Sequence, residues 1–137
     1  MTRHVVFRAD EIPEGGQKLT TIEGRAICVF NQGGEFFALL DRCPHEGGSL
    51  CAGARIGLVQ SSEPGKYEYT RRGELIKCPW HAWEFDIRTG QSWFDPKRVR
   101  VKAFDVNVAD GETLVKGPYV AETFPVSVEE NYIVIEV

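Results

Sequence analysis

Two short motifs carry the side chains with the clearest capacity for chemistry in this chain. The first is Cys-Pro-His at residues 43–45, and the second is Cys-Pro-Trp-His at residues 78–81. Each motif supplies one thiolate and one imidazole, ligand types that suit zinc or an iron–sulfur centre. The proline after each cysteine fixes the backbone of a turn and removes an N–H group there. The candidate metal ligands are therefore Cys43, His45, Cys78 and His81, and their spacing alone leaves zinc and an iron–sulfur cluster as alternatives.

The segments around these motifs are typical of an all-β protein. Short runs rich in Val, Ile, Phe and Tyr are broken repeatedly by Gly, Pro, Asn and Asp. Residues 25–30 and 35–40 flank Asn-Gln-Gly-Gly at 31–34, which predicts a β-hairpin. Val-Arg-Val-Lys at 99–102 alternates apolar and basic residues, which predicts a half-buried strand. No segment sustains the apolar periodicity of an amphipathic helix, so we expect little helix.

The residues around both motifs resemble a known family. Cys-x-His followed downstream by Cys-x-x-His is the pattern of Rieske proteins, in which two histidines replace two cysteines on one iron of a [2Fe–2S] cluster. The segments FFALLDRCPHEGGSL and IKCPWHAWEFDIRTGQSW resemble the cluster-binding loops of bacterial Rieske ferredoxins and of ring-hydroxylating oxygenases. The resemblance implies one [2Fe–2S] cluster. Cys43 and Cys78 would hold its buried iron, and His45 and His81 would hold the outer iron near the surface.

The same resemblance implies a fold. We expect a Rieske iron–sulfur fold, with an antiparallel β-sandwich or barrel base and a small cluster-binding subdomain of two loops. Residues 1–137 would form a single Rieske domain, in which a subdomain at about 42–96 is inserted in a base formed by 1–41 and 97–137. The stretch between the two motifs is longer than in the shortest family members, which predicts an extra hairpin between the loops.

Two aromatic residues bear on the expected redox potential. High-potential Rieske proteins donate a serine and a tyrosine hydroxyl to the cluster, and the resemblance places Trp83 and Phe85 at those positions. Those proteins also bridge their loops by a disulfide, which Gly48 and Trp80 cannot form here. Hydrogen bonds to the sulfurs stabilise the reduced state, so we expect a potential near the low end of the Rieske range, roughly −150 mV.

Composition narrows the classes of partner and the compartment. The chain has 137 residues and a formal net charge of −4, which argues against a nucleic-acid binder. No apolar run is long enough to span a bilayer and the first residues do not resemble a signal peptide, so we expect a cytoplasmic protein with no membrane partner. Thiols stay reduced there, so the four cysteines indicate metal before disulfides. We expect Cys28 and Cys51 to pack as small hydrophobes, with a fifth ligand or a redox thiol as alternatives for Cys51.

The histidine count bears on enzymatic activity. A terminal oxygenase needs a mononuclear iron held by two histidines and a carboxylate, and the two motifs leave only His4, an expected surface residue. The chain also lacks a G-x-G-x-x-G fingerprint for flavin or nicotinamide. We therefore expect that the protein is not an enzyme on its own. We expect it to be a soluble one-electron carrier, the ferredoxin component of a multicomponent aromatic-ring oxygenase system. An NAD(P)H-dependent flavin reductase would be its donor and a terminal oxygenase its acceptor. The alternative is a small accessory subunit of a larger redox enzyme, such as a nitrite-reductase-like complex.

Overall fold

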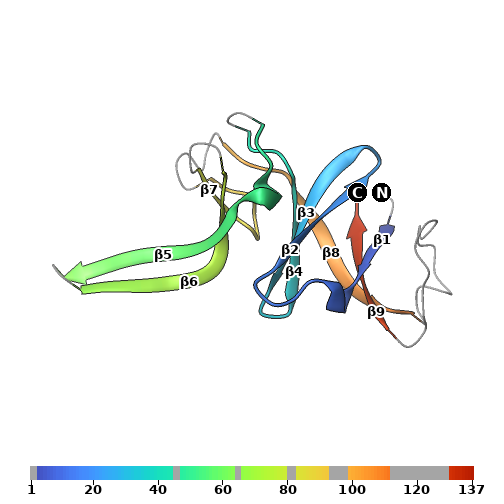
Figure 1. Ribbon diagram of the computed structural model, residues 1–137, viewed down its shortest axis with the longest axis horizontal. Helices are drawn as coiled ribbons and strands as arrows, with labels where there is room; N and C mark the ends of the chain where they lie inside the picture. The colour runs from blue at the N-terminus through green and yellow to red at the C-terminus, as the bar shows by residue number, and fades with distance from the viewer. Residues whose placement is uncertain (1–2, 45–46, 64–65, 80–82, 93–98, 112–129) are drawn as a thin grey trace.

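The structure is a computed structural model that describes residues 3–44, 47–63, 66–79, 83–92, 99–111 and 130–137, with the backbone alone for 58–63 and 66–72. Strands dominate this part of the chain, which confirms the all-β expectation (Figure 1). The elements are β1 (Arg3–Arg8), η1 (Ala9–Glu11), β2 (Gln17–Ile22), β3 (Arg25–Gln32), β4 (Glu35–Leu40), η2 (Leu50–Ala52), β5 (Ala54–Glu63), β6 (Lys66–Lys77), β7 (Glu84–Asp86), β8 (Ala103–Asp110) and β9 (Asn131–Glu136). The two η elements are short 3-10 helices.

Six strands form one antiparallel sheet in the order β1-β9-β8-β4-β3-β2. Every one of these strands contributes side chains to a common apolar core. The buried members of that core include Phe7, Ile22, Ile27, Val29, Ala38, Phe104, Ile133 and Ile135. A sheet whose strands all face one core must curl around it, so this sheet is barrel-like. The pairing of β1 with β9 places the two ends of the described chain side by side (Figure 1).

The hairpin predicted around residues 31–34 is present. β3 and β4 pair in antiparallel register from Ile27↔Leu40 to Gln32↔Glu35. The turn between them uses Gly33 and Gly34 at φ 62° and 90°. Side chains other than glycine rarely adopt this left-handed region, which explains the Gly-Gly pair at the tip.

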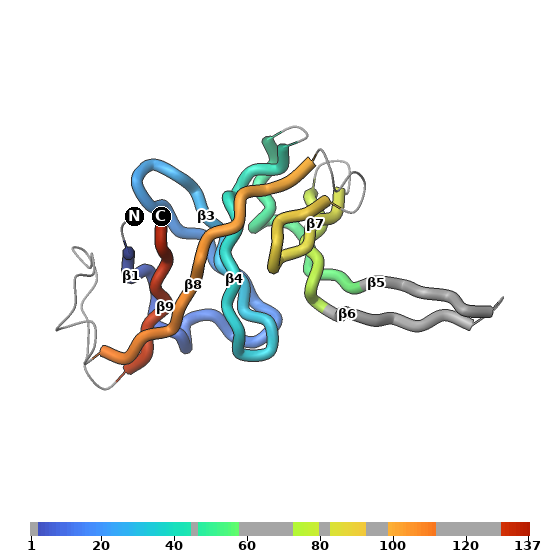
Figure 2. The backbone as a smooth tube through the Cα atoms, turned by 180° about the vertical axis from the view of Figure 1, so that it is seen from behind, coloured from blue at the N-terminus to red at the C-terminus, as the bar shows by residue number. Residues whose placement is uncertain are grey.

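Strand β3 is buried on both of its faces. Ile27 and Val29 contact the barrel core, whereas the alternate residues Cys28 and Phe30 contact a second apolar core. In both views of the backbone, β3 and β4 lie between the β1–β9 edge and β7 (Figures 1 and 2). Strands β3 and β4 therefore separate the barrel core from the core that contains Cys43 and Cys78 of the two motifs.

A second sheet has the order β5-β6-β7. β5 and β6 form a long antiparallel hairpin that runs from Ala54↔Lys77 to Glu63↔Lys66, with register shifts on the way. This is the hairpin that the sequence predicts between the two motifs. Gly53 lies just before β5, and a Cβ there would overlap the Lys77 carbonyl oxygen. Glycine at this position lets the chain that leaves the first motif pass directly against the chain that enters the second.

The strand predicted at 99–102 is wrong, because β8 begins only at Ala103. The expected alternation in burial is nevertheless present, since Val101 is buried while Arg100 and Lys102 are exposed. Residues 99–101 pair briefly with residues 90–92: the Val99 carbonyl accepts from the Ser92 N–H, and the Val101 N–H donates to the Gly90 carbonyl, on either side of an isolated bridge between Gln91 and Arg100. The next residue changes partner, because the Lys102 carbonyl accepts from the Leu40 N–H. An extended segment between two neighbours alternates its side chains without forming a regular ladder.

Candidate metal centre

The two cysteines of the motifs follow strands that belong to different sheets. Cys43 comes shortly after β4, and Cys78 comes directly after β6. Each is only 1% exposed, and both belong to the same apolar core. Neither of them takes part in a disulfide. The fold therefore brings two buried thiols, distant in sequence, into one apolar environment.

Each of these cysteines closes a loop of the same size. The backbone N–H of Cys43 donates to the Gly48 carbonyl at 2.8 Å, and the N–H of Cys78 donates to the Trp83 carbonyl at 2.7 Å. Both bonds join a residue to the fifth residue after it. In the first loop, the N–H of Gly47 also donates to the Cys43 carbonyl at 2.7 Å, and Gly47 adopts a φ of 81° that favours glycine. The loops are thus two similar turns, each fixed at its cysteine.

The histidines of both motifs fall inside these closed loops in the sequence. His45 lies between Cys43 and Gly48, and His81 lies between Cys78 and Trp83. Residues 45–46 and 80–82, the latter including Trp80, lie outside the described part of the chain. The assignment of His45 and His81 as ligands therefore stays a prediction.

The surroundings of the two thiols are apolar. The buried side chains of this core include Leu39, Leu50, Ile76, Phe85, Ile87 and Val101. Trp83 is half-buried and packs against the same core. Such a shell keeps water from the two thiols, and solvent exposure is one of the factors that set the potential of an iron–sulfur cluster. Two buried thiols on two closed loops are a donor set that fits the thiolate side of a [2Fe–2S] cluster.

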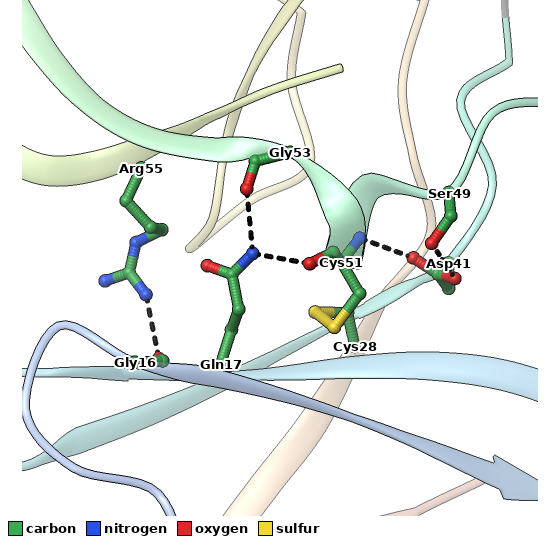
Figure 3. The surroundings of a disulfide bond; sticks show 8 residues. All are labelled: Gly16, Gln17, Cys28, Asp41, Ser49, Cys51, Gly53 and Arg55. Carbon is green, nitrogen blue, oxygen red and sulfur yellow. Dashed lines mark hydrogen bonds between the residues drawn. A yellow bond between two sulfur atoms is a disulfide. The ribbon is translucent and has the colours of Figure 1, made fainter. Parts of the chain in front are cut away.

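A network of hydrogen bonds fastens the end of the first loop to the barrel (Figure 3). The Asp41 carboxylate accepts from the Ser49 hydroxyl and from the Cys51 N–H, both at 2.7 Å. The Gln17 side-chain amide donates to the carbonyls of Cys51 at 2.8 Å and of Gly53 at 3.1 Å. The chain after the first loop is therefore held by polar contacts to strand β2 and to Asp41, which follows strand β4.

A disulfide reinforces the same attachment. Cys28 of β3 and Cys51 of η2 are bonded through their sulfurs, with their Cα atoms 5.4 Å apart (Figure 3). Cys28 is fully buried, as expected for a small core residue, and Cys51 is partly exposed. The expectation that all four cysteines stay out of disulfides is wrong for this pair. Sequence reasoning missed it because the pairing depends on η2 lying over β3, and local pattern does not reveal that contact.

Arg55 was also missed, and it joins the second sheet to the barrel. Its guanidinium donates to the carbonyls of Gly73 at 2.6 Å, Gly16 at 3.0 Å and Asn31 at 3.2 Å. It also donates to the Gln32 side chain at 2.6 Å. Burial lowers the pKa of Arg55, yet a guanidinium remains charged at neutral pH. The planar fork of arginine lets one side chain satisfy acceptors in β3, in β6 and in the turn just before β2.

His4 lies in β1, in a setting different from the one expected. Its side chain is only 15% exposed, so the prediction of a surface residue is wrong. Its Nε2 atom lies 3.6 Å from the Glu23 carboxylate. The residue lies in β1, opposite Ile135 of β9, and belongs to neither of the two loops.

Comparison with known proteins decides the family. Residues 2–105 match the family described as the Rieske [2Fe-2S] domain. The chain belongs to the Rieske [2Fe–2S] domain family. That match includes both closed loops and the strands β1 to β7 that position them, together with the start of β8.

Similar Rieske proteins are ferredoxin subunits of dioxygenases. The 3-phenylpropionate/cinnamic acid dioxygenase ferredoxin subunit of Shigella flexneri serotype 5b is 29% identical over 118 residues, which are 86% of this chain and 96% of that protein. The subunit of the same name from Photorhabdus laumondii is 29% identical over 115 residues, or 84% of this chain and 94% of that protein. These relatives match this chain over nearly their whole length.

Solved Rieske structures share the fold. The ferredoxin of carbazole 1,9a-dioxygenase from Nocardioides aromaticivorans IC177 is similar with a TM-score of 0.61 and 21% identity, over 97% of both chains. A complex of reduced oxygenase and oxidised ferredoxin in carbazole 1,9a-dioxygenase contains a chain similar at 22% identity and a TM-score of 0.61, over 96% of this chain and 91% of that chain. The likeness confirms the predicted Rieske fold. Among the residues described here, no helix has the length and apolar character to cross a membrane.

Proposed function

We propose that this chain is a one-electron carrier, the ferredoxin component of a multicomponent dioxygenase system. It would hold one [2Fe–2S] cluster through the thiolates of Cys43 and Cys78 on one iron and the imidazoles of His45 and His81 on the other. The observation that supports this most is the pair of buried thiols, each at the start of a loop closed by the same backbone bond. The cluster supplies one-electron transfer when it is bound.

The residues around the site have separate tasks in this proposal. The backbone bonds from Cys43 to Gly48 and from Cys78 to Trp83 close the two loops that carry the predicted ligands. The apolar core keeps water from the thiolate side. The imidazole side would then be the route for electrons, because histidine edges near the surface allow close approach of a partner. The chain would thus position and insulate the redox group, without binding an organic substrate.

The proposed partners follow from the relatives. A ferredoxin similar to this chain occurs in a complex with its terminal oxygenase, which supports a terminal oxygenase as the acceptor here. The donor would be an NAD(P)H-dependent flavin reductase, since the sequence lacks a dinucleotide fingerprint of its own. The proposal includes a cytoplasmic location and a division into a base of residues 1–41 and 97–137 and a cluster-binding subdomain of about 42–96.

We also propose a low potential. Phe85 lies fully buried in the core that holds both cysteines, and it has no hydroxyl to offer. Trp83 packs against the same core. With neither side chain able to donate an O–H group to a sulfur, the reduced state would lack that stabilisation.

Cluster content tests the ligand set. Iron and acid-labile sulfide are measured in the anaerobically purified protein, together with the electron paramagnetic resonance spectrum of the reduced form. We expect Cys43→Ser, Cys78→Ser, His45→Ala and His81→Ala each to lose the Rieske spectrum. His4→Ala is the control for the histidine variants, and it should retain the spectrum. Stoichiometric zinc without sulfide would refute the proposal.

Turnover tests the role as a carrier. The protein is mixed with a flavin reductase, NADH and a Rieske-type terminal oxygenase, and product formation is followed. We expect product only when reductase, carrier and oxygenase are all present. Product formed at the same rate without this chain would contradict the carrier role.

A further inference from the structure

We propose that Cys28 and Cys51 form a reversible thiol–disulfide site that sets how firmly the first cluster loop is held to the barrel. The substrate class is a dithiol reductant, with the corresponding disulfide as oxidant in the reverse direction. The bond joins β3 to η2, and its Cα separation of 5.4 Å lies in the range of an ordinary disulfide. Its consequence for the cluster rests on the proposed function.

The exposure of the two cysteines gives the exchange a direction. Cys28 is fully buried beneath the segment that carries Cys51, whereas Cys51 is partly exposed. A dithiol therefore reaches the Cys51 sulfur first. Its thiolate bonds to Cys51 Sγ, the disulfide breaks, and Cys28 Sγ leaves as a thiolate that takes up a proton. The second thiol of the reductant then displaces Cys51, so that the protein gains two electrons and two protons while the dithiol becomes a disulfide.

The site is coupled to the first loop by contacts on both sides of Cys43. Asp41 precedes Cys43 by two residues, and its carboxylate accepts hydrogen bonds from Ser49 and from the N–H of Cys51 (Figure 3). The disulfide therefore connects the segment after the loop to β3, while Asp41 connects it to the segment before the loop. A change at Cys51 is transmitted directly to the residues that flank a predicted iron ligand.

Reduction would loosen this attachment without releasing it. The bonds from Gln17 to the carbonyls of Cys51 and Gly53 do not involve sulfur, and neither do the bonds to Asp41. The reduced protein thus keeps its polar contacts and loses the covalent one. In a reducing compartment the disulfides that do form are usually transient or redox-sensing. A bond whose reduction loosens the first loop but leaves its polar contacts intact fits such a role.

The first experiment measures the thiols directly. The folded holoprotein, oxidised or treated with dithiothreitol, is quenched with acid and freed of reductant, then denatured and alkylated with iodoacetamide, and its peptides are analysed by mass spectrometry. We expect Cys28 and Cys51 to be unlabelled before treatment, to be labelled after it, and to lose labelling again after addition of oxidised dithiothreitol. Free thiols at both positions in the oxidised protein would overturn the proposal. So would a bond that resists dithiothreitol in the folded protein, or zinc bound to these sulfurs beside Asp41.

The second experiment measures the consequence for the loop. Amide hydrogen exchange of residues 47–53 is compared between the protein with the Cys28–Cys51 disulfide intact and the protein with this disulfide reduced. Cluster loss to a chelator is followed in both by visible absorbance. We expect several-fold faster exchange and several-fold faster cluster loss after reduction. The variant with Cys28→Ala and Cys51→Ala should show the fast rates in both conditions. Ser61→Ala in the β5–β6 hairpin is the control, and it should keep the response to dithiothreitol.

The two readouts separate this inference from the proposed function. If the protein lacks iron and sulfide but its exchange still responds to the disulfide, the carrier role fails and the thiol–disulfide site stands. If the cluster is present but neither rate responds to reduction, the carrier role stands and the coupling is refuted.

Discussion

Replacing Arg55 by methionine tests how the second sheet is fastened to the barrel. Methionine keeps an apolar stem of similar length against Phe30, whose ring lies 5.3 Å from the guanidinium carbon. The four hydrogen bonds of the guanidinium are lost. They are not equal in consequence. The Gly16 carbonyl also accepts the Asn31 N–H at 3.0 Å, and the Asn31 carbonyl also accepts the Gly15 N–H at 3.0 Å.

The magnitude follows from this difference. The carbonyls of Gly16 and Asn31 each keep a backbone N–H donor after the substitution. The loss of stability therefore comes mainly from the bonds to Gly73 and to the Gln32 side chain. A hydrogen bond to a charged group contributes about 1.5–3 kcal/mol to stability, which puts the gross loss at about 3–6 kcal/mol. Removing a partly buried charge offsets part of this, in the direction shown by the lowered pKa of Arg55. We expect a net loss of about 2 kcal/mol in the free energy of unfolding.

The assay is the thermal unfolding midpoint of the holoprotein. For a domain of this size, about 2 kcal/mol corresponds to roughly 8 °C. Arg55→Lys keeps the charge without the planar fork, so it should fall between the wild type and Arg55→Met. Arg25→Met, at an exposed arginine of β3, is the control and should stay within about 2 °C. If Arg55→Met is as stable as that control, the reasoning that these bonds hold the two sheets together is wrong.

Three further predictions concern single positions. Gly53→Ala should destabilise the protein by about 1–3 kcal/mol, because its Cβ would overlap the Lys77 carbonyl oxygen next to the second loop; a wild-type melting temperature would contradict this. The Glu11 carboxylate accepts the Arg8 N–H at 2.8 Å, and this bond lowers the pKa of Glu11 below its ordinary value of 4.5. A lowered pKa gives stability that is present at neutral pH and lost on acidification. Glu11→Gln should therefore be less stable than the wild type near pH 7, and it should lose less stability than the wild type between about pH 5 and about pH 3. Acid titrations of both proteins, monitored by circular dichroism, would show this difference. Phe85→Tyr should raise the midpoint potential by roughly 40 mV if its hydroxyl donates one hydrogen bond of about 1 kcal/mol to a sulfur, and a spectroelectrochemical titration that shows no rise would count against that position.

Local sequence was sufficient for the parts of this protein that depend on neighbouring residues. The β3–β4 hairpin follows from two apolar runs around a Gly-Gly turn, since the positive φ values of Gly33 and Gly34 are a local requirement. The hairpin between the motifs follows in the same way from its length and composition. The predicted ligand types also rest on local sequence, because thiolate and imidazole chemistry belongs to the side chains themselves. The family is visible in the sequence for the same reason.

Contacts between distant segments had to be decided by the tertiary structure. Residues 99–102 alternate like a strand, yet they pair first with residues 90–92 and then with Leu40, so the contact with each neighbour is too short to form a regular strand. Arg55 reads as an ordinary charged residue of a strand until β2 and β3 are placed beside it.

The cysteines show the same division most clearly. From the sequence alone, Cys28 and Cys51 are two apolar positions in separate elements, and Cys43 and Cys78 are halves of two motifs. Only the fold lays η2 over β3 and buries both motif cysteines in one core. Residue type determines what a sulfur can bind, but its partner is determined by which backbone segments pack together, and that depends on the whole chain.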